Sequence, residues 1–221
     1  MTEQQTAGIT PKPLNRLQMA QRVAADIPEG WCVNLGIGVP TLVADAIPAD
    51  REVIIHSENG ILGMGPAPAE AERDPWLINA GKQHVTLRPG GSYFHHADSF
   101  ALVRGGHVDL CVLGAYEVAE NGDFANWATS DTEAAPAVGG AMDLAAGARR
   151  IWVVMEHTTR EGRPKLVRAC SYPLTAPAAV SRIYTNLAVL DVTPDGLKVV
   201  ELVPGLDLAG LRAVTEARVV G

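Results

Sequence analysis

Apolar runs with little polar alternation place the strongest constraint on how this chain folds. They occupy residues 52–57 (EVIIHS), 108–114 (VDLCVLG) and 151–157 (IWVVMEH). Such runs are typical of strands that are covered on both faces of a sheet. Segments with helical spacing of apolar residues, such as 14–27 and 97–106, alternate with them. The alternation predicts a three-layer α/β fold, with a mainly parallel sheet and helices on both faces.

The remaining segments complete this expected architecture. Residues 31–36 are expected to form a strand, and further helices are expected at 39–47, 139–150 and 205–217. Arg149 and Arg150 close the second of these helices, where positive charge complements the helix dipole. Turn signals predict hairpins at Asn121-Gly122 within 116–127, and at Pro194, Asp195 and Gly196 within 187–203. We expect a flexible tail over 1–13 and one domain over 14–221, with a β-hairpin elaboration near its C-terminal end.

The composition limits which binding partners and which cellular compartment we expect for this chain. The formal net charge is -7 and no run of Lys or Arg occurs, so nucleic acid is not an expected partner. Each apolar stretch is interrupted well before the roughly 20 residues that a membrane span requires, and the first residues lack an apolar signal segment. Three cysteines lie far apart in sequence, which indicates reduced thiols. A cytoplasmic protein without membrane contact is expected.

Two strand ends supply candidate site residues. Residues 31–36 run into a turn with Gly36 and Gly38, but Thr41 stands where a dinucleotide fingerprint requires a third glycine. The backbone amides of this turn could face a ligand, or the turn could be purely structural. Asn34, just inside the strand, could bind a ligand or cap the turn.

Glu58 follows the strand over 52–57 directly. Ligands of open α/β sheets bind beyond the carboxyl ends of the strands, so Glu58 could be a base, a metal ligand or a nucleophile. A metal is not expected, because only His56 stands nearby and should point to the opposite face from Ser57. Taken alone, a capping or turn carboxylate is the simpler interpretation.

Three other features allow both a functional and a structural interpretation. His95 and His96 are adjacent, but a metal site would need a third ligand at a suitable place. Trp127 could form a substrate wall, although a core aromatic is the simpler interpretation. Gly139 and Gly140 open a predicted helix, where free amides could face developing negative charge or close packing could require glycine.

Several motifs together resemble one enzyme family. The motifs are SENGILGMGP, ADSFALVRGGHVDL, GDFANW, GGAMDLAAGA and VVMEHT. In order and spacing they resemble the B subunit of class I, 3-oxoacid-type CoA-transferases, over about residues 14 to 203. The resemblance implies that Glu58 is the nucleophile, which forms first an acyl-glutamyl anhydride and then a glutamyl-CoA thioester.

The resemblance also implies roles for other residues. Gly140, preceded by Gly139, supplies a backbone amide to the oxyanion. Asn34 and Asn59 line the site, and Gly36, Gly38 and Gly60 belong to the substrate- or CoA-binding backbone. No metal and no cofactor are implied, since CoA and succinyl-CoA are substrates.

Two stretches, 81–100 and 136–144, are similar to the 3-oxoadipate branch of the family. The acetoacetate branch usually carries a Lys- and Met-containing run where residues 134–138 stand here, but an acetoacetate-type transferase subunit and an acyl-CoA hydrolase subunit remain alternatives. A non-enzymatic sensor built on the same sheet is a third. Arg88, His95 and His96 are candidates for binding the distal carboxylate of a dicarboxylic acid.

The chain also lacks one motif of the family. The glycine-rich G-x-G-G-F motif of the A half is not present, and residues 90–94 (GGSYF) do not match it. A separate A subunit is therefore implied, in an α2β2 assembly.

Overall fold

The computed structural model describes residues 11–130 and 139–221. Most of the predicted tail, and residues 134–138, which differ from the acetoacetate branch, therefore lie outside the described residues. Residues 11–13 are exposed and form no helix or strand.

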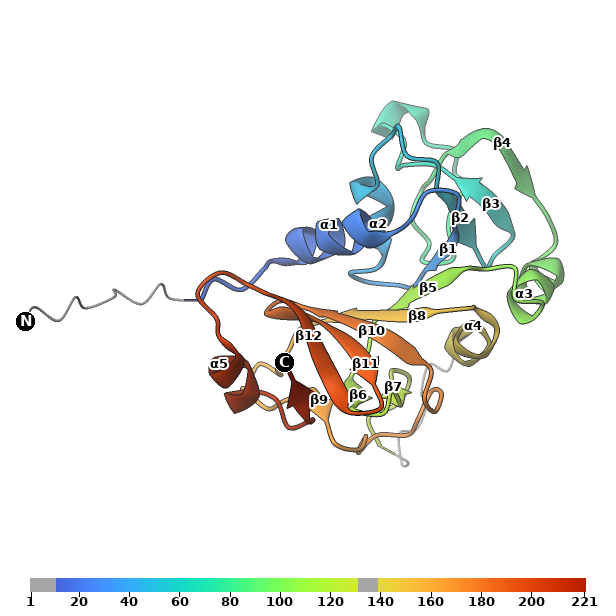
Figure 1. Cartoon of the computed structure of the whole chain (residues 1–221). Helices are drawn as coiled ribbons and strands as arrows, with labels where there is room; N and C mark the ends of the chain where they lie inside the picture. Colours follow the sequence, from blue (N-terminus) through green and yellow to red (C-terminus); the bar gives the residue numbers. More distant parts are fainter. Residues whose placement is uncertain (1–10, 131–138) are drawn as a thin grey trace, which may run out of the picture.

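A ten-stranded sheet forms the centre of the molecule (Figure 1). Its middle consists of five parallel strands in the order β10-β8-β5-β1-β2. Their bounds are β1 Cys32–Leu35, β2 Ile54–Ser57, β5 Leu110–Leu113, β8 Ile151–Met155 and β10 Val180–Thr185. The structure thus confirms the predicted mainly parallel sheet, although β10 was not predicted from the sequence.

Both sides of this parallel centre are extended by antiparallel strands. Beyond β2 lie β3 (Ile61–Met64) and β4 (Leu87–Tyr93), which were not predicted because glycines interrupt both segments. Beyond β10 lie β11 (Ala188–Thr193) and β12 (Gly196–Leu202), the predicted C-terminal hairpin. Strand β13 (Val219–Val220) pairs with β12 in parallel. The hairpin therefore continues the main sheet.

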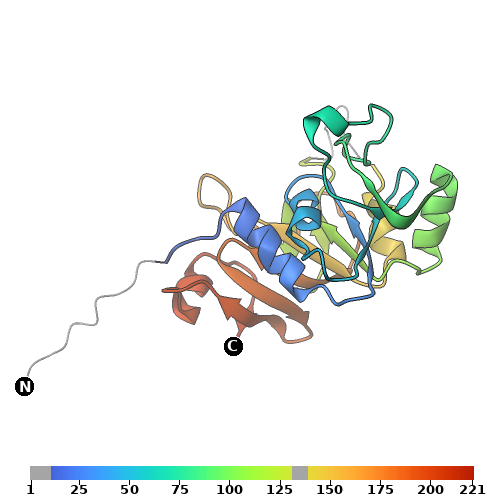
Figure 2. The same ribbon diagram turned by 90° about the horizontal axis from the view of Figure 1, so that it is seen from above.

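Helices and a small second sheet cover the main sheet. Helices α1 (Arg16–Asp26) and α2 (Thr41–Ala46) lie on one face, as Figures 1 and 2 show. The opposite core includes residues of α3, α4, α5 and the β7-β6-β9 sheet. The bounds of these elements are α3 His96–Arg104, α4 Ala141–Gly147, α5 Leu208–Ala213, β6 Glu117–Ala119, β7 Phe124–Ala125 and β9 Leu166–Val167. A short 3-10 helix, η1, spans Glu70–Glu72.

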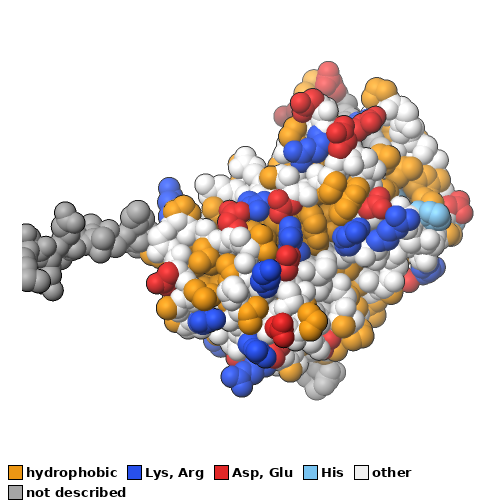
Figure 3. Space-filling view, in the orientation of Figure 1, with side chains coloured by type: hydrophobic (Ala, Val, Ile, Leu, Met, Phe, Trp, Pro, Cys, Tyr) orange, Lys and Arg blue, Asp and Glu red, His pale blue; other side chains and the backbone are white. Residues whose placement is uncertain are grey.

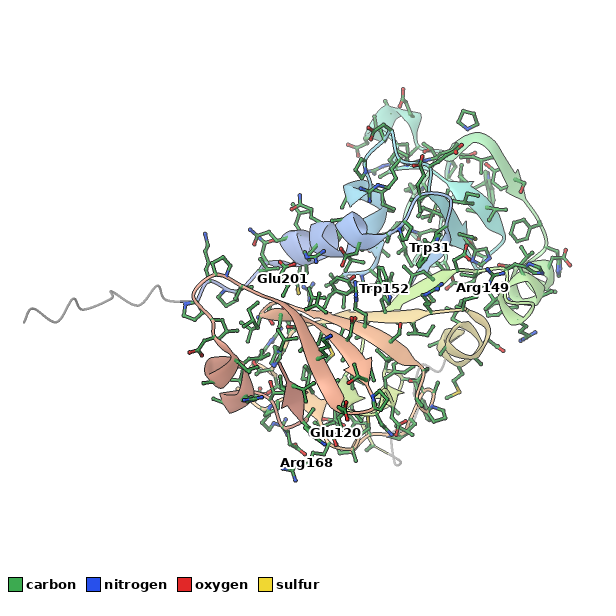
Figure 4. All side chains as sticks on the ribbon, in the orientation of Figure 1. Trp31, Glu120, Arg149, Trp152, Arg168 and Glu201 are labelled. Carbon is green, nitrogen blue, oxygen red and sulfur yellow. The ribbon has the colours of Figure 1, made fainter. Side chains whose placement is uncertain are left out.

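Local sequence explains several of these boundaries. Asn15 and Gln18 form a capping box at the start of α1, in which each side chain binds the other residue's backbone N–H. Gly122 adopts φ +89 in the predicted β6-β7 turn, a conformation that favours glycine. The prediction for the end of α4 is wrong: α4 ends at Gly147, so Arg149 and Arg150 both lie beyond its last turn. The Arg149 guanidinium donates to the Gly106 carbonyl and pairs with Asp109 instead (Figure 4).

The two faces of the central strands carry alternate residues into separate cores. On β8, Trp152 and Val154 pack in the core beneath α1, while Ile151 and Val153 pack on the opposite side. Trp31 lies 6.2 Å from Trp152 between ring centroids, and both are labelled in Figure 4. Alternation of this kind requires apolar residues at every position, which is why the runs in the sequence are continuous.

Two general features concern the charge of the surface and the length of the helices. Acidic and basic side chains are interspersed over the face in Figure 3. Among the helices of the described residues, none is long and apolar enough to cross a membrane.

A buried histidine joins the end of β8 to the segment after α5. His157 is inaccessible to solvent, and its ring nitrogens lie 3.0 Å from Thr185 Oγ1 and 2.8 Å from Thr215 Oγ1. Burial lowers the pKa of His157 to about 4, from an ordinary value near 6.5. The folded state therefore holds this ring neutral through the mildly acidic range.

We expect this histidine to make stability depend on pH. Between pH 6.5 and 4 the unfolded chain binds a proton that the folded ring does not, so the free energy of unfolding falls as pH falls. From pH 7 to pH 5 the contribution of His157 to this fall is about 2 kcal/mol. Urea unfolding at both pH values should therefore show a smaller fall for His157→Gln than for the wild type. The exposed His107→Gln variant serves as the control and should retain the wild-type difference. Equal falls in all three proteins would contradict the expectation.

Candidate active site

The ends of β1 and β2 bring Asn34 and Glu58 together. The two strands are parallel neighbours, and Asn34 stands opposite His56 in their register. On the other side of β1, Asn34 stands opposite Cys111 of β5. Glu58 follows β2 directly, so its carboxylate reaches the same rim as the end of β1. The predicted convergence of these two strand ends is present in the structure.

The Glu58 carboxylate is held by a buried amide. Asn34 Nδ2 donates to Glu58 Oε2 over 2.9 Å, and Asn34 has no solvent exposure while Glu58 is half-buried. The main chain of Glu58 is fixed as well, because His96 Nδ1 donates to its carbonyl oxygen over 3.0 Å. The carboxylate is thus positioned by a rigid strand while part of it stays open to a ligand.

The other contacts of Asn34 hold it within the sheet. Its Nδ2 lies 3.1 Å from His56 Nδ1, and its Oδ1 accepts a hydrogen bond from Cys111 Sγ over 3.4 Å. Burial lowers the pKa of His56 to about 4, so this ring is neutral near pH 7. Burial, together with the negative charge of Glu58, raises the pKa of the Cys111 thiol well above its ordinary value. Cys111 therefore acts here as a thiol donor and not as a thiolate nucleophile.

Gly60 allows the chain to turn sharply after Glu58. Its φ is +113, and a Cβ at this position would collide with the carbonyl oxygen of Phe94. The Gly60 carbonyl accepts from the backbone N–H of Phe94 over 3.0 Å, which ties the turn to the chain between β4 and α3. A side chain would break this contact, so glycine is required here.

Glu58 borders two cavities. The larger has a volume of about 370 Å³, and Glu58 shares its wall with residues from the ends of β1 and β5 and the start of α4. These residues are Gly36, Ile37, Leu113, Gly114, Ala115, Tyr116, Asn126, Gly139, Gly140, Ala141 and Leu144. The smaller has a volume of about 20 Å³, room for one water molecule, beside Ser57, Asn79 and Gly81. An acyl group could therefore approach Glu58 from the larger cleft.

Some of the site residues predicted from the sequence lie at the Glu58 cleft, and others do not. Asn34, Gly36, Gly139 and Gly140 lie with Glu58 at the larger cleft or touch its carboxylate. Gly140 also fits the expectation that close packing requires glycine at the start of this helix, since a Cβ there would lie 2.8 Å from Phe100 Cζ.

The remaining predicted residues lie outside the lining of the two cavities that Glu58 borders. Gly38 belongs to the turn before α2 and accepts from Thr41 Oγ1, and Asn59 Nδ2 donates to the Ile78 carbonyl. Arg88 lies on β4, His95 caps α3 through Ala97 N, and His96 contacts the main chain of Glu58.

Sequence reasoning missed several residues of this site. Cys111 is one of the three cysteines from which the sequence indicates only reduced thiols, but its place opposite Asn34 makes it a neighbour of the amide. Ser99 of α3 lies 2.7 Å from His56 Nε2, a contact that no sequence spacing indicates.

Trp127 is half-buried and donates to the Leu174 carbonyl, so it is neither a full core residue nor part of the cleft. Within the part of the chain that the structure describes, no group of three or more His, Cys, Asp or Glu side chains is arranged to hold a metal ion.

Comparisons with known proteins identify the family of the chain. The family model described as Coenzyme A transferase matches residues 16–211. The B subunit of the 3-oxoadipate CoA-transferase of Pseudomonas putida is 62% identical over 204 residues, which is 92% of this chain and 95% of the relative. Its counterpart from Acinetobacter baylyi is 56% identical over 207 residues, 94% of this chain and 95% of the relative.

Solved structures share the fold at low identity. The acyl-CoA transferase YdiF of Escherichia coli O157:H7, as the apoenzyme, superposes with a TM-score of 0.71 at 22% identity. It covers 94% of this chain, whereas this chain spans 42% of YdiF. The family model and the curated relatives together cover most of the sequence, so this chain belongs to the coenzyme A transferase family.

Proposed function

We propose that the chain is the B subunit of a 3-oxoadipate CoA-transferase, which moves CoA from succinyl-CoA to 3-oxoadipate. The observation that carries the proposal is the Glu58 carboxylate, held by buried Asn34 at the wall of an open cleft. The substrate assignment is supported by the identities. They are 62% and 56% to relatives named for 3-oxoadipate, against 47% to the B subunit of a probable succinyl-CoA:3-ketoacid coenzyme A transferase of Bacillus subtilis.

The first half of the proposed cycle transfers CoA to the enzyme. One Glu58 carboxylate oxygen attacks the thioester carbon of succinyl-CoA, the C–S bond breaks, and CoA thiolate leaves a mixed anhydride. The thiolate then attacks the Glu58 carbonyl carbon, the anhydride C–O bond breaks, and succinate departs. Glu58 is left as a thioester of CoA, so one difficult exchange becomes two easier steps.

The second half repeats these steps with the acceptor. A carboxylate oxygen of 3-oxoadipate attacks the Glu58 thioester carbon and expels CoA thiolate. The thiolate attacks the acceptor carbonyl of the new anhydride, which releases 3-oxoadipyl-CoA and restores the Glu58 carboxylate. No proton is gained or lost over the cycle, and no cofactor beyond the CoA substrates is required.

Donors near the carboxylate suit the charge that develops in these steps. Each attack on the Glu58 carbonyl carbon places negative charge on an oxygen that can accept from Asn34 Nδ2. The Gly140 backbone lines the same cleft at the start of α4, and we assign its amide to the oxyanion of the substrate. We assign Gly36, Gly38 and Gly60 to the backbone that shapes this site. We assign the side chain of Asn59 to its lining. A water-poor site strengthens such interactions, because the effective dielectric constant is low.

The proposal includes a second polypeptide. The relatives are named as B subunits, and this chain spans less than half of the single-chain YdiF. A separate A subunit in an α2β2 assembly would close the cleft, and the assembly would work in the cytoplasm.

Two alternatives keep the same nucleophile. A succinyl-CoA:acetoacetate-type transferase is supported by relatives such as the B subunit of the succinyl-CoA:3-ketoacid coenzyme A transferase of Helicobacter pylori, at 45% identity. An acyl-CoA hydrolase would need water at Glu58, and the water-sized cavity beside Ser57 is the feature that favours it. A transferase should accumulate the glutamyl-CoA species when no acceptor acid is present, whereas a hydrolase should turn over freely.

The nucleophile assignment is tested by replacing Glu58. We expect Glu58→Gln and Glu58→Asp, assayed with the A subunit of a close relative, to lose at least about a thousandfold of the exchange rate. The amide is a poor nucleophile, and the shorter aspartate withdraws the oxygen from the cleft. Borohydride reduction after incubation with succinyl-CoA, followed by peptide mapping, should modify residue 58 in the wild type and in neither Glu58 variant.

Glu120 supplies the control for this experiment. It is partly buried, accepts from the Arg218 backbone N–H and lies outside the Glu58 cleft (Figure 4). Glu120→Gln should keep the exchange rate and the label on residue 58. Exchange at the wild-type rate in Glu58→Gln would remove Glu58 from the nucleophile role.

The choice of acid is tested along β4 and the start of α3. We assign Arg88 on β4, together with His95 and His96, to the distal carboxylate of the acceptor, since Phe94 connects this part of the chain to the Glu58 turn by donating to the Gly60 carbonyl. Arg88→Gln and His95→Gln should raise the KM for 3-oxoadipate about tenfold and leave that for acetoacetate, which lacks a second carboxylate, unchanged. His96 is left intact because it binds the Glu58 main chain. Equal KM changes for both acids would contradict this assignment.

A further inference from the structure

A continuous row of polar groups runs from helix α3 to the Glu58 carboxylate. Ser99 Oγ lies 2.7 Å from His56 Nε2, His56 Nδ1 lies 3.1 Å from Asn34 Nδ2, and Asn34 Nδ2 donates to Glu58 Oε2 over 2.9 Å. Ser99, His56 and Asn34 are each at most 1% exposed. Three polar side chains are thus buried behind one half-buried carboxylate.

The two hydrogens of the Asn34 amide have separate acceptors. One N–H points to Glu58 Oε2, and the other points to His56, with ring Nδ1 at 3.1 Å and the backbone carbonyl oxygen at a longer 3.4 Å. The amide oxygen faces Cys111, which donates to it. Nδ1 can accept only if it carries no proton, so the neutral ring must hold its proton on Nε2. That N–H then donates to Ser99 Oγ, so the Asn34 amide sets the ring tautomer and the serine oxygen supplies the acceptor that this tautomer needs.

We propose that His56 is a positioning residue for the exchange reaction, which holds the Asn34 amide turned with its N–H toward Glu58. It acts through Asn34 and does not touch the substrate. The inference rests on the proposed function, because its effect is measured on exchange at Glu58.

The physical reason lies in the near symmetry of an amide side chain. A half-turn about the last side-chain bond would exchange the nitrogen and oxygen of Asn34. The oxygen would then face both the Glu58 carboxylate and His56 Nδ1, so acceptors would oppose acceptors. With Nδ1 present as an acceptor, only the observed orientation satisfies both neighbours. Without it, the orientation would depend on Glu58, the Cys111 thiol and the longer contact of Asn34 Nδ2 with the His56 carbonyl oxygen.

The consequence falls on the chemical steps more than on binding. During each attack on the Glu58 carbonyl carbon, the oxygen bound to Asn34 gains negative charge. A donor that is already oriented stabilises this charge without reorganisation at that moment. Loss of the orientation should therefore lower kcat while the KM for succinyl-CoA changes little.

A purely structural role for His56 gives a different expectation. A buried polar side chain with satisfied partners contributes to stability, and its loss would lower the free energy of unfolding without a specific effect on kcat. His157 provides the comparison, since it is equally buried and binds two threonine hydroxyls.

Paired substitutions at residue 56 separate the two roles. The oxygen of asparagine can occupy the place of ring Nδ1 and accept from Asn34, whereas glutamine reaches toward Ser99 and leaves that place without an acceptor. We expect His56→Gln to lower kcat about 10- to 100-fold, and His56→Asn to recover most of this loss. Ser99→Ala should lower kcat by a smaller factor, because the buried Nε2–H of the ring then lacks its acceptor while Asn34 still donates to Nδ1. His157→Gln should leave kcat unchanged.

The kinetic measurement uses the full chain assembled with its A subunit, and thermal melting establishes that each variant is folded. Equal kcat values for His56→Gln and His56→Asn, or a wild-type kcat in His56→Gln, would overturn the proposal. If the wild type forms no adduct at residue 58, the proposed function fails instead, and the two failures are distinguishable.

A spectroscopic measurement keeps the inference testable if a variant does not fold. ¹⁵N-labelled histidine in the full wild-type chain should report a neutral His56 ring with its proton on Nε2 and not on Nδ1 at pH 7. In Ser99→Ala the proportion with the proton on Nδ1 should rise. A wild-type ring that carries its proton on Nδ1 would overturn the proposal, because that nitrogen could not accept from Asn34.

Discussion

The parallel pairing of β1 with β2 on one side and β5 on the other is the constraint on which the site depends. The register sets His56, Asn34 and Cys111 side by side across three strands, and Glu58 follows one residue beyond β2. A shift of one residue would turn Asn34 to the face that α1 and α2 cover and would separate it from the carboxylate. The continuous apolar packing on both faces of these strands fixes this register.

Polar groups within such a core are stable only when each has a partner. Among the described residues, no buried side-chain nitrogen or oxygen lacks a hydrogen-bond partner. Asn34 satisfies this condition by using a carboxylate as one of its acceptors, so the catalytic candidate is also part of the packing of the sheet. This arrangement explains how a carboxylate can be held in a fixed place while one side of it remains open to a cleft.

The site combines this rigid floor with walls from several segments that are distant in sequence. Gly36 follows β1, Gly114 follows β5, and Gly139 and Gly140 precede α4. Strand ends and helix starts meet at this rim because the strands run in parallel and the helices return over the sheet. The cleft is open to solvent in the isolated chain, which agrees with the proposal that a second polypeptide completes it.

The sequence alone determined the fold class, the convergence of two strand ends and, through its motifs, the enzyme family and the candidate nucleophile. These features depend on local apolar patterns and on short motifs, both of which are visible along the chain. It did not reveal β3, β4 and β10, because glycines and polar residues interrupt the first two and neighbours in space stabilise all three. It also misplaced Arg149 at the end of α4. Only the tertiary structure decided that Ser99, His56 and Cys111 surround Asn34. Contacts between residues 22 to 77 positions apart depend on strand register and helix packing, which no local pattern encodes.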